Sequence, residues 1–357
     1  MRLDRWTRGV AAGVLCLPLG CGDDGSLDPG RGSGTSTGLA SPNDGDASTA
    51  EAPMPTTTGS ADETETGSDD DSPSTTSTSG DSEDETGSTG GGGPPPVRPS
   101  AGCGLRAPAT GAIAGETTTV GGVERSYDMF VPEPYDTEHP HALIFSYHGV
   151  GGTANTNQFR LDVFSEDDGG VSINVAPQGW GHPNWPENHF VPFSFDDSVT
   201  VFDQVLDRIA ADYCIDLNRV FVIGNSNGGQ MAFHLGCVRG DRIRAIVPNG
   251  GRCFSYGTGL CDPYNGAAAQ TCAGEVMVLS VMGEDDTTRH ADEEATREGY
   301  RVRQGCSDQT EARDPEPCLR YTGCVDGGEV AYCRIPELRH GLWAEGRRDM
   351  YDYMMSL

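Results

Sequence analysis

A long run of small and acidic residues near the N-terminus limits what this chain can fold into. Residues 22–100 consist almost entirely of Gly, Ser, Thr, Asp, Glu and Pro, with almost no aromatic or branched apolar side chain. Such a segment buries too little apolar surface to offset the conformational entropy that ordering costs. We therefore expect residues 22–100 to form a disordered acidic tether. The folded part must come from residues 101–357, whose length suits one domain with a sizeable core.

The first 21 residues show the pattern of an export signal. Three arginines precede a short apolar stretch, which ends at the small residues Gly20 and Cys21. This stretch is far shorter than the roughly 18 residues of a membrane-spanning helix. Residues 17–21 resemble the lipobox of bacterial lipoproteins, in which the Cys is lipidated, although Pro18 stands where Leu is usual. We expect an extracellular or cell-envelope protein that is lipid-anchored through Cys21, with simple secretion as the alternative.

The charge balance excludes several classes of function. The 357 residues include 54 acidic and 24 basic residues, for a formal net charge of −30, and all of the basic residues are Arg. An acidic chain without a basic block argues against nucleic acid or an anionic membrane surface as the main partner. Because Lys is absent, a Walker-type phosphate loop and a Schiff-base mechanism are ruled out.

Ten cysteines within residues 101–357 predict disulfides, as an even number of cysteines does in an exported protein. They are Cys103, Cys214, Cys237, Cys253, Cys261, Cys272, Cys306, Cys318, Cys324 and Cys333. No C-x-x-C pair and no H-E-x-x-H helix supports a metal site. Short bridges are plausible between Cys318 and Cys324, or from Cys253 to Cys261 or Cys272. We expect the first cysteine to fasten the start of the domain to a distant segment.

The hydrophobic pattern of residues 101–357 alternates between strand and helix. This alternation indicates an α/β fold with a mostly parallel central sheet and helices on both faces. Strands are predicted over residues 126–131, 142–147, 171–176, 219–223, 243–247, 276–281 and 330–335. Helices are predicted over residues 197–213, 230–236, 291–304 and 346–355.

A G-x-S-x-G motif at residues 224–228 lies between a predicted strand and a predicted helix. Its glycines permit the strained turn that lifts a nucleophilic hydroxyl above a sheet. Ser226 is therefore the predicted nucleophile, and a glycine-rich turn with an idle serine is the alternative. The same motif surrounds Ser36 in the tether, where no strand precedes it and no helix follows it, so that copy predicts nothing.

Residues 147–152, with the sequence Y-H-G-V-G-G, directly follow a buried strand, as the oxyanion loop of α/β-hydrolases does. Glycines let the backbone N–H groups of such a loop face the substrate. We expect the N–H groups of Val150 and of Asn227, the residue after the nucleophile, to hold the oxyanion. A tight strand-to-helix turn without this role is the alternative.

His340 follows the last predicted strand and is the best placed of the 8 histidines to act as general base. The strand at residues 276–281 leads to three adjacent carboxylates, Glu284, Asp285 and Asp286. One of them is expected to orient His340 and to stabilise its protonated form. We choose Asp286, although spacing alone does not separate it from Asp285.

Residues 216–237 resemble the nucleophile region of the extracellular polyhydroxybutyrate depolymerase and feruloyl esterase family, within the wider carbohydrate esterase family 1. The resemblance extends over nearly all of residues 101–357. It implies an α/β-hydrolase fold in which Ser226 is the nucleophile, Asp286 the acid and His340 the base.

Aromatic residues are the expected substrate contacts. The resembled family often shows H-x-W-P at its histidine, whereas here two residues separate His340 from Trp343 and no Pro follows. We expect Trp343 on the wall of the acyl pocket, and Trp180 and Trp185 as platforms in the aromatic-rich loop of residues 178–195. Packing of this loop over the core is the alternative.

These features predict a serine esterase that hydrolyses carboxylic esters through an acyl-enzyme, without a metal or an organic cofactor. Polyhydroxyalkanoate polyesters and feruloyl or acetyl polysaccharides are the candidate substrates. We expect a monomer that meets a membrane only through its lipid anchor. Two alternatives remain. One is a serine peptidase of the prolyl-oligopeptidase type, for whose usual propeller the chain has no room, and the other is a non-catalytic surface-binding protein on a hydrolase fold.

Overall fold

The computed structural model describes residues 95–357, except for 157–158, 183–184, 191–194, 254–271 and 288–289. The predicted export signal, Cys21 and nearly all of the predicted tether lie outside the described residues. The last tether residues that the structure describes contact the domain. Pro99 pairs with Asp216, and Ser100 is buried.

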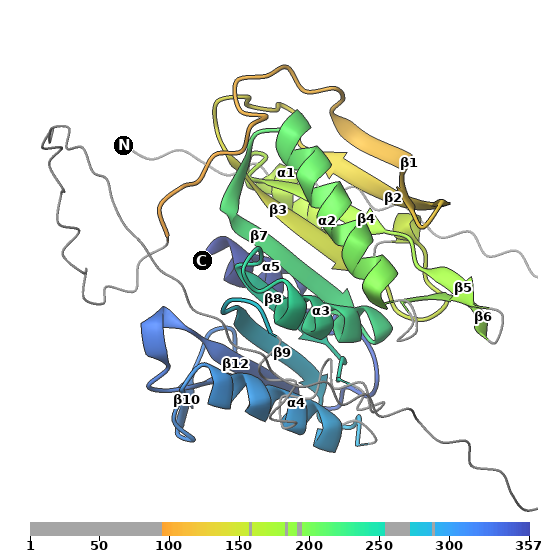
Figure 1. Ribbon diagram of the computed structural model, residues 1–357. Coiled ribbons are helices and arrows are strands. Elements are labelled where there is room, and N and C mark those ends of the chain that lie inside the picture. The colour runs from red at the N-terminus through yellow and green to blue at the C-terminus, as the bar shows by residue number, and fades with distance from the viewer. Residues whose placement is uncertain (1–94, 157–158, 183–184, 191–194, 254–271, 288–289) are drawn as a thin grey trace, which may run out of the picture. The chain divides into compact units, whose positions relative to one another are not determined.

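A sheet of ten strands passes through the middle of the domain in the order β1-β2-β4-β3-β7-β8-β9-β12-β11-β10 (Figure 1). Its strands are β1 (Gly111–Val120), β2 (Val123–Val131), β3 (His141–Tyr147), β4 (Ser172–Pro177), β7 (Ile215–Asn225), β8 (Ala245–Asn249), β9 (Met277–Gly283), β10 (Thr310–Ala312), β11 (Cys318–Tyr321) and β12 (Val330–Ile335). A separate hairpin pairs β5 (Trp180–His182) with β6 (Trp185–His189).

The strands in the middle of the sheet, from β4 to β12, are parallel. The two edges are antiparallel, formed by β1 and β2 on one side and by β10 and β11 on the other. Every residue of β3 and β8 is buried, as expected for parallel strands that are covered on both faces. The mostly parallel sheet confirms the predicted fold class.

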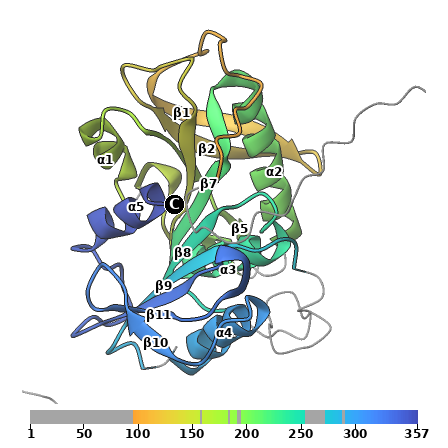
Figure 2. The same cartoon turned by 90° about the vertical axis from the view of Figure 1, so that its left-hand side faces the viewer.

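Helices cover both faces of this sheet (Figure 2). They are α1 (Leu161–Asp167), α2 (Phe195–Asp212), α3 (Asn227–Val238), α4 (His290–Arg303) and α5 (Arg347–Met355). Residues of α2 and α3 share a core with Leu143 and Val222, whereas residues of α1 and α5 share another core with Ile144 and Phe221. Successive residues of a central strand therefore enter opposite cores. In the part of the chain that the structure describes, no helix combines the length and the apolar character needed to cross a membrane.

Four disulfides join pairs of described residues. They are Cys103–Cys214, Cys237–Cys272, Cys306–Cys324 and Cys318–Cys333. The first spans 111 residues, which confirms the expectation of a distant partner for Cys103. The predicted local bridges from Cys318 to Cys324 and from Cys253 to Cys272 are wrong. Strand pairing selects the partner of Cys318, because Cys333 lies directly opposite it in the β11–β12 register. Cys253 is also disulfide-bonded, and Cys261 lies outside the described residues.

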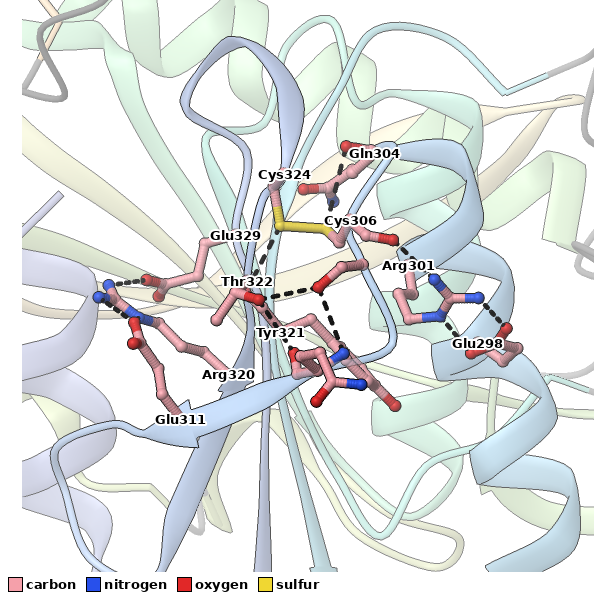
Figure 3. The surroundings of a disulfide bond; sticks show 12 residues. Glu298, Arg301, Gln304, Cys306, Glu311, Arg320, Tyr321, Thr322, Cys324 and Glu329 are labelled. Atoms are coloured by element: carbon pink, nitrogen blue, oxygen red, sulfur yellow. Dashed lines mark hydrogen bonds and ion pairs between the residues drawn. A yellow bond between two sulfur atoms is a disulfide. The ribbon is translucent and has the colours of Figure 1, made fainter.

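The Cys306–Cys324 bridge joins the segment after α4 to the segment after β11 (Figure 3). Beside it, Arg320 of β11 donates to Glu311 of β10 at 2.7 Å and to Glu329 at 3.4 Å. These contacts fasten the short antiparallel edge of the sheet, whose outermost strand, β10, is exposed at every position.

Candidate active site

Ser226 occupies a sharp turn between β7 and α3 that glycines make possible. Its φ of 55° and ψ of −112° are unfavourable for a residue with a side chain, so the turn is strained. A Cβ on Gly224 would lie 2.1 Å from Gly228 O, and a Cβ on Gly228 would lie 2.1 Å from Tyr147 O. On the other side, Asn249 O accepts the Ser226 N–H at 2.8 Å. Close packing of the backbone on both sides therefore holds the serine in its strained conformation.

Two hydrogen bonds connect Ser226, His340 and Asp286 in a row. Ser226 Oγ lies 2.8 Å from His340 Nε2, and His340 Nδ1 lies 2.7 Å from Asp286 Oδ2. A carboxylate only accepts hydrogen bonds, so Nδ1 carries the proton and Nε2 is left to accept from the serine hydroxyl. In this tautomer the imidazole can take the proton of Ser226.

The loop after β9 separates its neighbouring carboxylates. Asp286 is 4% exposed and contacts His340, whereas Glu284 and Asp285 are exposed. The Asp285 N–H also donates to Leu338 O at 2.9 Å, which ties this loop to the segment that carries the histidine. The geometry therefore favours Asp286 over Asp285 as the partner of His340.

The predicted oxyanion loop passes beside Ser226. A Cβ on Gly149 would lie 3.5 Å from Ser226 Cβ. A turn follows, closed by a 3.0 Å bond from the Gly152 N–H to Gly149 O, and Val150 within this turn is 57% exposed. Asn227 is the first residue of α3, where an N–H group has no partner inside the helix. The two residues predicted to hold an oxyanion thus belong to segments on either side of the serine.

His148 fixes the start of the oxyanion loop. Its Nδ1–H donates to Gly149 O at 2.7 Å, and its Nε2 accepts the Gly179 N–H at 3.0 Å. An imidazole that accepts at one nitrogen is neutral, and burial lowers the pKa of His148 below its ordinary value of 6.5. His148 therefore connects this loop to the segment that leads into β5 as an uncharged side chain.

The side chain of Asn227 has a contact that no sequence pattern indicated. Its Oδ1 accepts the Phe190 N–H at 2.6 Å, and its Nδ2 donates to Phe190 O at 2.9 Å. Phe190 is 1% exposed, and its ring packs against Tyr147 and His148. The residue after the serine thus anchors the chain just beyond β6. Periodicity could not find this pair, because the two residues are 37 positions apart.

The three tryptophans predicted as substrate contacts have different surroundings. Trp180 is half-buried against the core, and the Arg125 guanidinium lies 3.9 Å from its ring centroid. Trp185 belongs to β6, but its side chain lies outside the described residues. Trp343 is 8% exposed, and a Cβ on Gly346 would lie 2.2 Å from its ring. Trp343 therefore packs mainly against the core, and its place on the wall of an acyl pocket stays a prediction.

Together these groups can perform acyl transfer. A hydroxyl within hydrogen-bond reach of an oriented imidazole is the arrangement that activates a serine nucleophile. Backbone N–H groups beside it can stabilise the negative charge on a carbonyl oxygen. Over the described ranges, no three His, Cys, Asp or Glu side chains are grouped as a metal site.

Comparison with known proteins gives the same fold. Residues 185–294 match the family described as alpha/beta hydrolase fold. The match includes Ser226 and Asp286 and ends before His340. Among solved structures, an acetyl xylan esterase from Aspergillus awamori superposes with a TM-score of 0.51 at 14% identity, over 68% of this chain and 99% of that chain. At this identity the likeness concerns the fold alone, and the chain has an α/β-hydrolase fold.

Known feruloyl esterases resemble the chain in sequence. It is 27% identical over 257 residues to feruloyl esterase D of Neurospora crassa, covering 66% of this chain and 80% of that protein. It is 30% identical over 175 residues to probable feruloyl esterase C of Aspergillus terreus, covering 47% of this chain and 59% of that protein. The second match therefore spans less than two thirds of the relative. The chain is thus similar in sequence to feruloyl esterases, and its fold is that of the α/β-hydrolases.

Proposed function

We propose that this protein is a serine esterase that hydrolyses carboxylic esters through a covalent acyl-enzyme. The observation that carries the proposal is the hydrogen-bonded row from Ser226 Oγ through His340 to Asp286, mounted on a strained strand-to-helix turn. Similarity to feruloyl esterases adds independent support from sequence. The proposal assigns Ser226 as nucleophile, His340 as general base and Asp286 as the acid that orients it.

In the first step, Ser226 Oγ attacks the ester carbonyl carbon while its proton moves to His340 Nε2. The carbonyl oxygen takes the electron pair of the broken π bond and becomes an oxyanion. The N–H groups of Val150 and Asn227 donate to it. When the oxyanion collapses, the bond to the alcohol breaks, and the departing oxygen takes the proton from His340. The acyl group is then bound to Ser226.

In the second step, water attacks the acyl carbon and gives a proton to His340 Nε2. Collapse of this second oxyanion breaks the bond to Ser226 Oγ, which recovers its proton from the imidazole. The carboxylate of Asp286 stays ionised and stabilises the imidazolium in both steps. The side chain of Asp286 is 2% exposed, so its charge lies beside His340 Nδ1 and away from solvent.

We propose feruloyl or acetyl esters of polysaccharides as the substrate class. The named relatives are feruloyl esterases. An open site also supports this choice, because the His340 side chain is 34% exposed and an ester on a bulky chain needs access to it. A polyhydroxyalkanoate polyester is the second candidate from the sequence, and direct comparison of the two classes decides between them.

We also propose that the protein is an exported monomer, anchored by lipid at Cys21. Support comes from the lipobox-like residues 17–21 and from the disulfides, four of which join pairs of described residues. Disulfides form and persist in oxidising compartments. If a lipid anchors the chain, Cys21→Ser should move the protein from the membrane fraction of a bacterial host to the soluble fraction. If Cys21→Ser does not change the distribution of the protein between the fractions, the lipid anchor at Cys21 is excluded and simple secretion remains. Light scattering of the mature protein tests the monomer.

Replacement of the nucleophile tests the proposed function. Ser226→Ala should fold normally and lose hydrolysis of p-nitrophenyl acetate, whereas Ser36→Ala, in the second copy of the motif, should keep the parental rate. A panel of methyl ferulate, acetylated xylan, polyhydroxybutyrate film and a peptide amide then separates the substrate classes. Hydrolysis of the peptide alone would favour a peptidase, and no hydrolysis at all would favour a binding protein. Parental activity in Ser226→Ala would refute the assignment.

A further inference from the structure

Asn249 is the last residue of β8, between the strands that lead to Ser226 and to Asp286. It lies in register with Asn225 of β7 and with Val281 of β9. Its carbonyl accepts the Ser226 N–H at 2.8 Å, and the next residue, Gly250, donates to Val281 O at 2.7 Å. The backbone around Asn249 therefore already connects two of the three segments that form the site.

The side chain of Asn249 contacts the third segment. It is buried at 1% exposure and makes three hydrogen bonds. Nδ2 donates to Gly341 O at 2.7 Å and to Asn225 Oδ1 at 2.9 Å, while Oδ1 accepts the Trp343 N–H at 3.1 Å. A carbonyl accepts and an N–H donates, so the contacts to Gly341 and Trp343 determine which way the amide faces.

These bonds matter because His340 is not on a regular element. It lies between β12 and α5, outside the helices and strands, in a segment that the loop after β9 also contacts through the Asp285 N–H bond to Leu338 O. The Asn249 amide binds the carbonyl of Gly341 and the N–H of Trp343, as a peptide group of a neighbouring strand would. Gly250 also approaches the imidazole, since a Cβ on it would lie 3.4 Å from His340 Cε1.

We propose that Asn249 is a positioning residue for the reaction. It holds the His340 segment against the Ser226 turn, so that His340 Nε2 stays at 2.8 Å from Ser226 Oγ. The role requires an amide, because one side chain must donate to Gly341 and accept from Trp343. A carboxylate of the same shape lacks the N–H donor, and one of its oxygens would face the two oxygens that Nδ2 now contacts, Gly341 O and Asn225 Oδ1. This inference rests on the proposed esterase function.

The test compares Asn249→Asp with Asn174→Asp. Asn174 is a matched control, since it is a buried asparagine of the same sheet, in β4, whose Nδ2 contacts Ser172 Oγ at 3.4 Å. With p-nitrophenyl acetate, Asn249→Asp should lower kcat about 100-fold while KM stays within about twofold, the loss typical of a misplaced catalytic group.

Asn174→Asp should lose thermal stability without this change in kcat. The proposal is overturned if Asn249→Asp keeps the parental kcat, or if its loss of activity equals its unfolded fraction. Should Asn249→Asp fail to fold, Asn249→Ser decides, because it adds no charge and cannot reach both partners. It should lower kcat about tenfold at unchanged KM, and a parental kcat would overturn the proposal. Failure of the esterase function itself would appear separately, as parental turnover in Ser226→Ala.

Discussion

Replacement of Asp286 by Asn tests whether the acid sets the tautomer of His340. In the parent, Asp286 Oδ2 accepts the Nδ1–H at 2.7 Å, which leaves Nε2 free to take the serine proton. An Asn of the same shape can turn an N–H towards Nδ1, which places the imidazole proton on Nε2 and removes the base. It also removes the charge that stabilises the imidazolium, in a position that is only 2% exposed. The corresponding change in the worked serine-protease example lowers kcat about 10⁴-fold, or about 5.4 kcal/mol of transition-state stabilisation.

The adjacent carboxylate supplies the control. Asp285 is exposed, and its backbone N–H contacts Leu338 O, so Asp285→Asn should change kcat by less than about twofold. Steady-state hydrolysis of p-nitrophenyl acetate at pH 8, together with thermal melts of both variants, measures the difference. Equal rates for the two variants would refute the assignment of the acid. A large loss in Asp285→Asn alone would move the acid to that residue.

Three further predictions concern folding. Gly228→Ala should destabilise the domain by about 1–3 kcal/mol and reduce activity, because the new Cβ would lie 2.1 Å from Tyr147 O at the end of β3. An unchanged melting temperature would contradict this packing. Replacing Cys103 and Cys214 by Ala should cost about 2–5 kcal/mol in denaturant unfolding, since their bridge closes 111 residues, and an unchanged midpoint would contradict it. Burial lowers the pKa of His148 in the folded protein. The contribution of His148 to stability is therefore complete above its unfolded pKa of about 6.5, and it is lost as the pH falls towards the lower pKa of the folded state. His148→Gln, which keeps an acceptor for Gly179, should therefore lose less stability between pH 7 and pH 5 than the parent does, and an equal loss would exclude His148 as a source.

The sequence predicted the middle of the fold better than its edges. Central strands are buried on both faces, so they appear as continuous apolar runs, and the strand predicted at residues 330–335 coincides with β12. β1 and β10 were missed because their residues are mostly exposed and polar, and they become strands only by pairing with a neighbour. The short helix α1 was missed for a related reason. Its seven residues are too few to show a helical period.

In the candidate site, too, the features set by neighbouring residues were predictable, whereas those set by contacts between distant residues were not. The turn at Ser226 was predictable because its glycines are adjacent in sequence and a strand and a helix flank it. The choice between Asp285 and Asp286 was not, because it depends on which side chain a loop turns towards His340. The burial of Trp343 was also not predictable from local sequence. Its ring packs against Gly346, and its backbone N–H donates to Asn249, which is 94 residues away in the chain.

The strained turn at Ser226 and the role proposed for Asn249 have a common physical basis. A residue at φ 55° and ψ −112° costs free energy, so it persists only where its surroundings leave no alternative. Here the backbone of Gly228 is pressed against the end of β3 on one side, and Asn249 O binds the Ser226 N–H on the other. Because the side chain of Asn249 also binds the His340 segment, any relaxation of the serine turn would shift the base with it. On the roles proposed above, one buried amide therefore couples the strain at Ser226 to the position of His340, the group proposed to activate it.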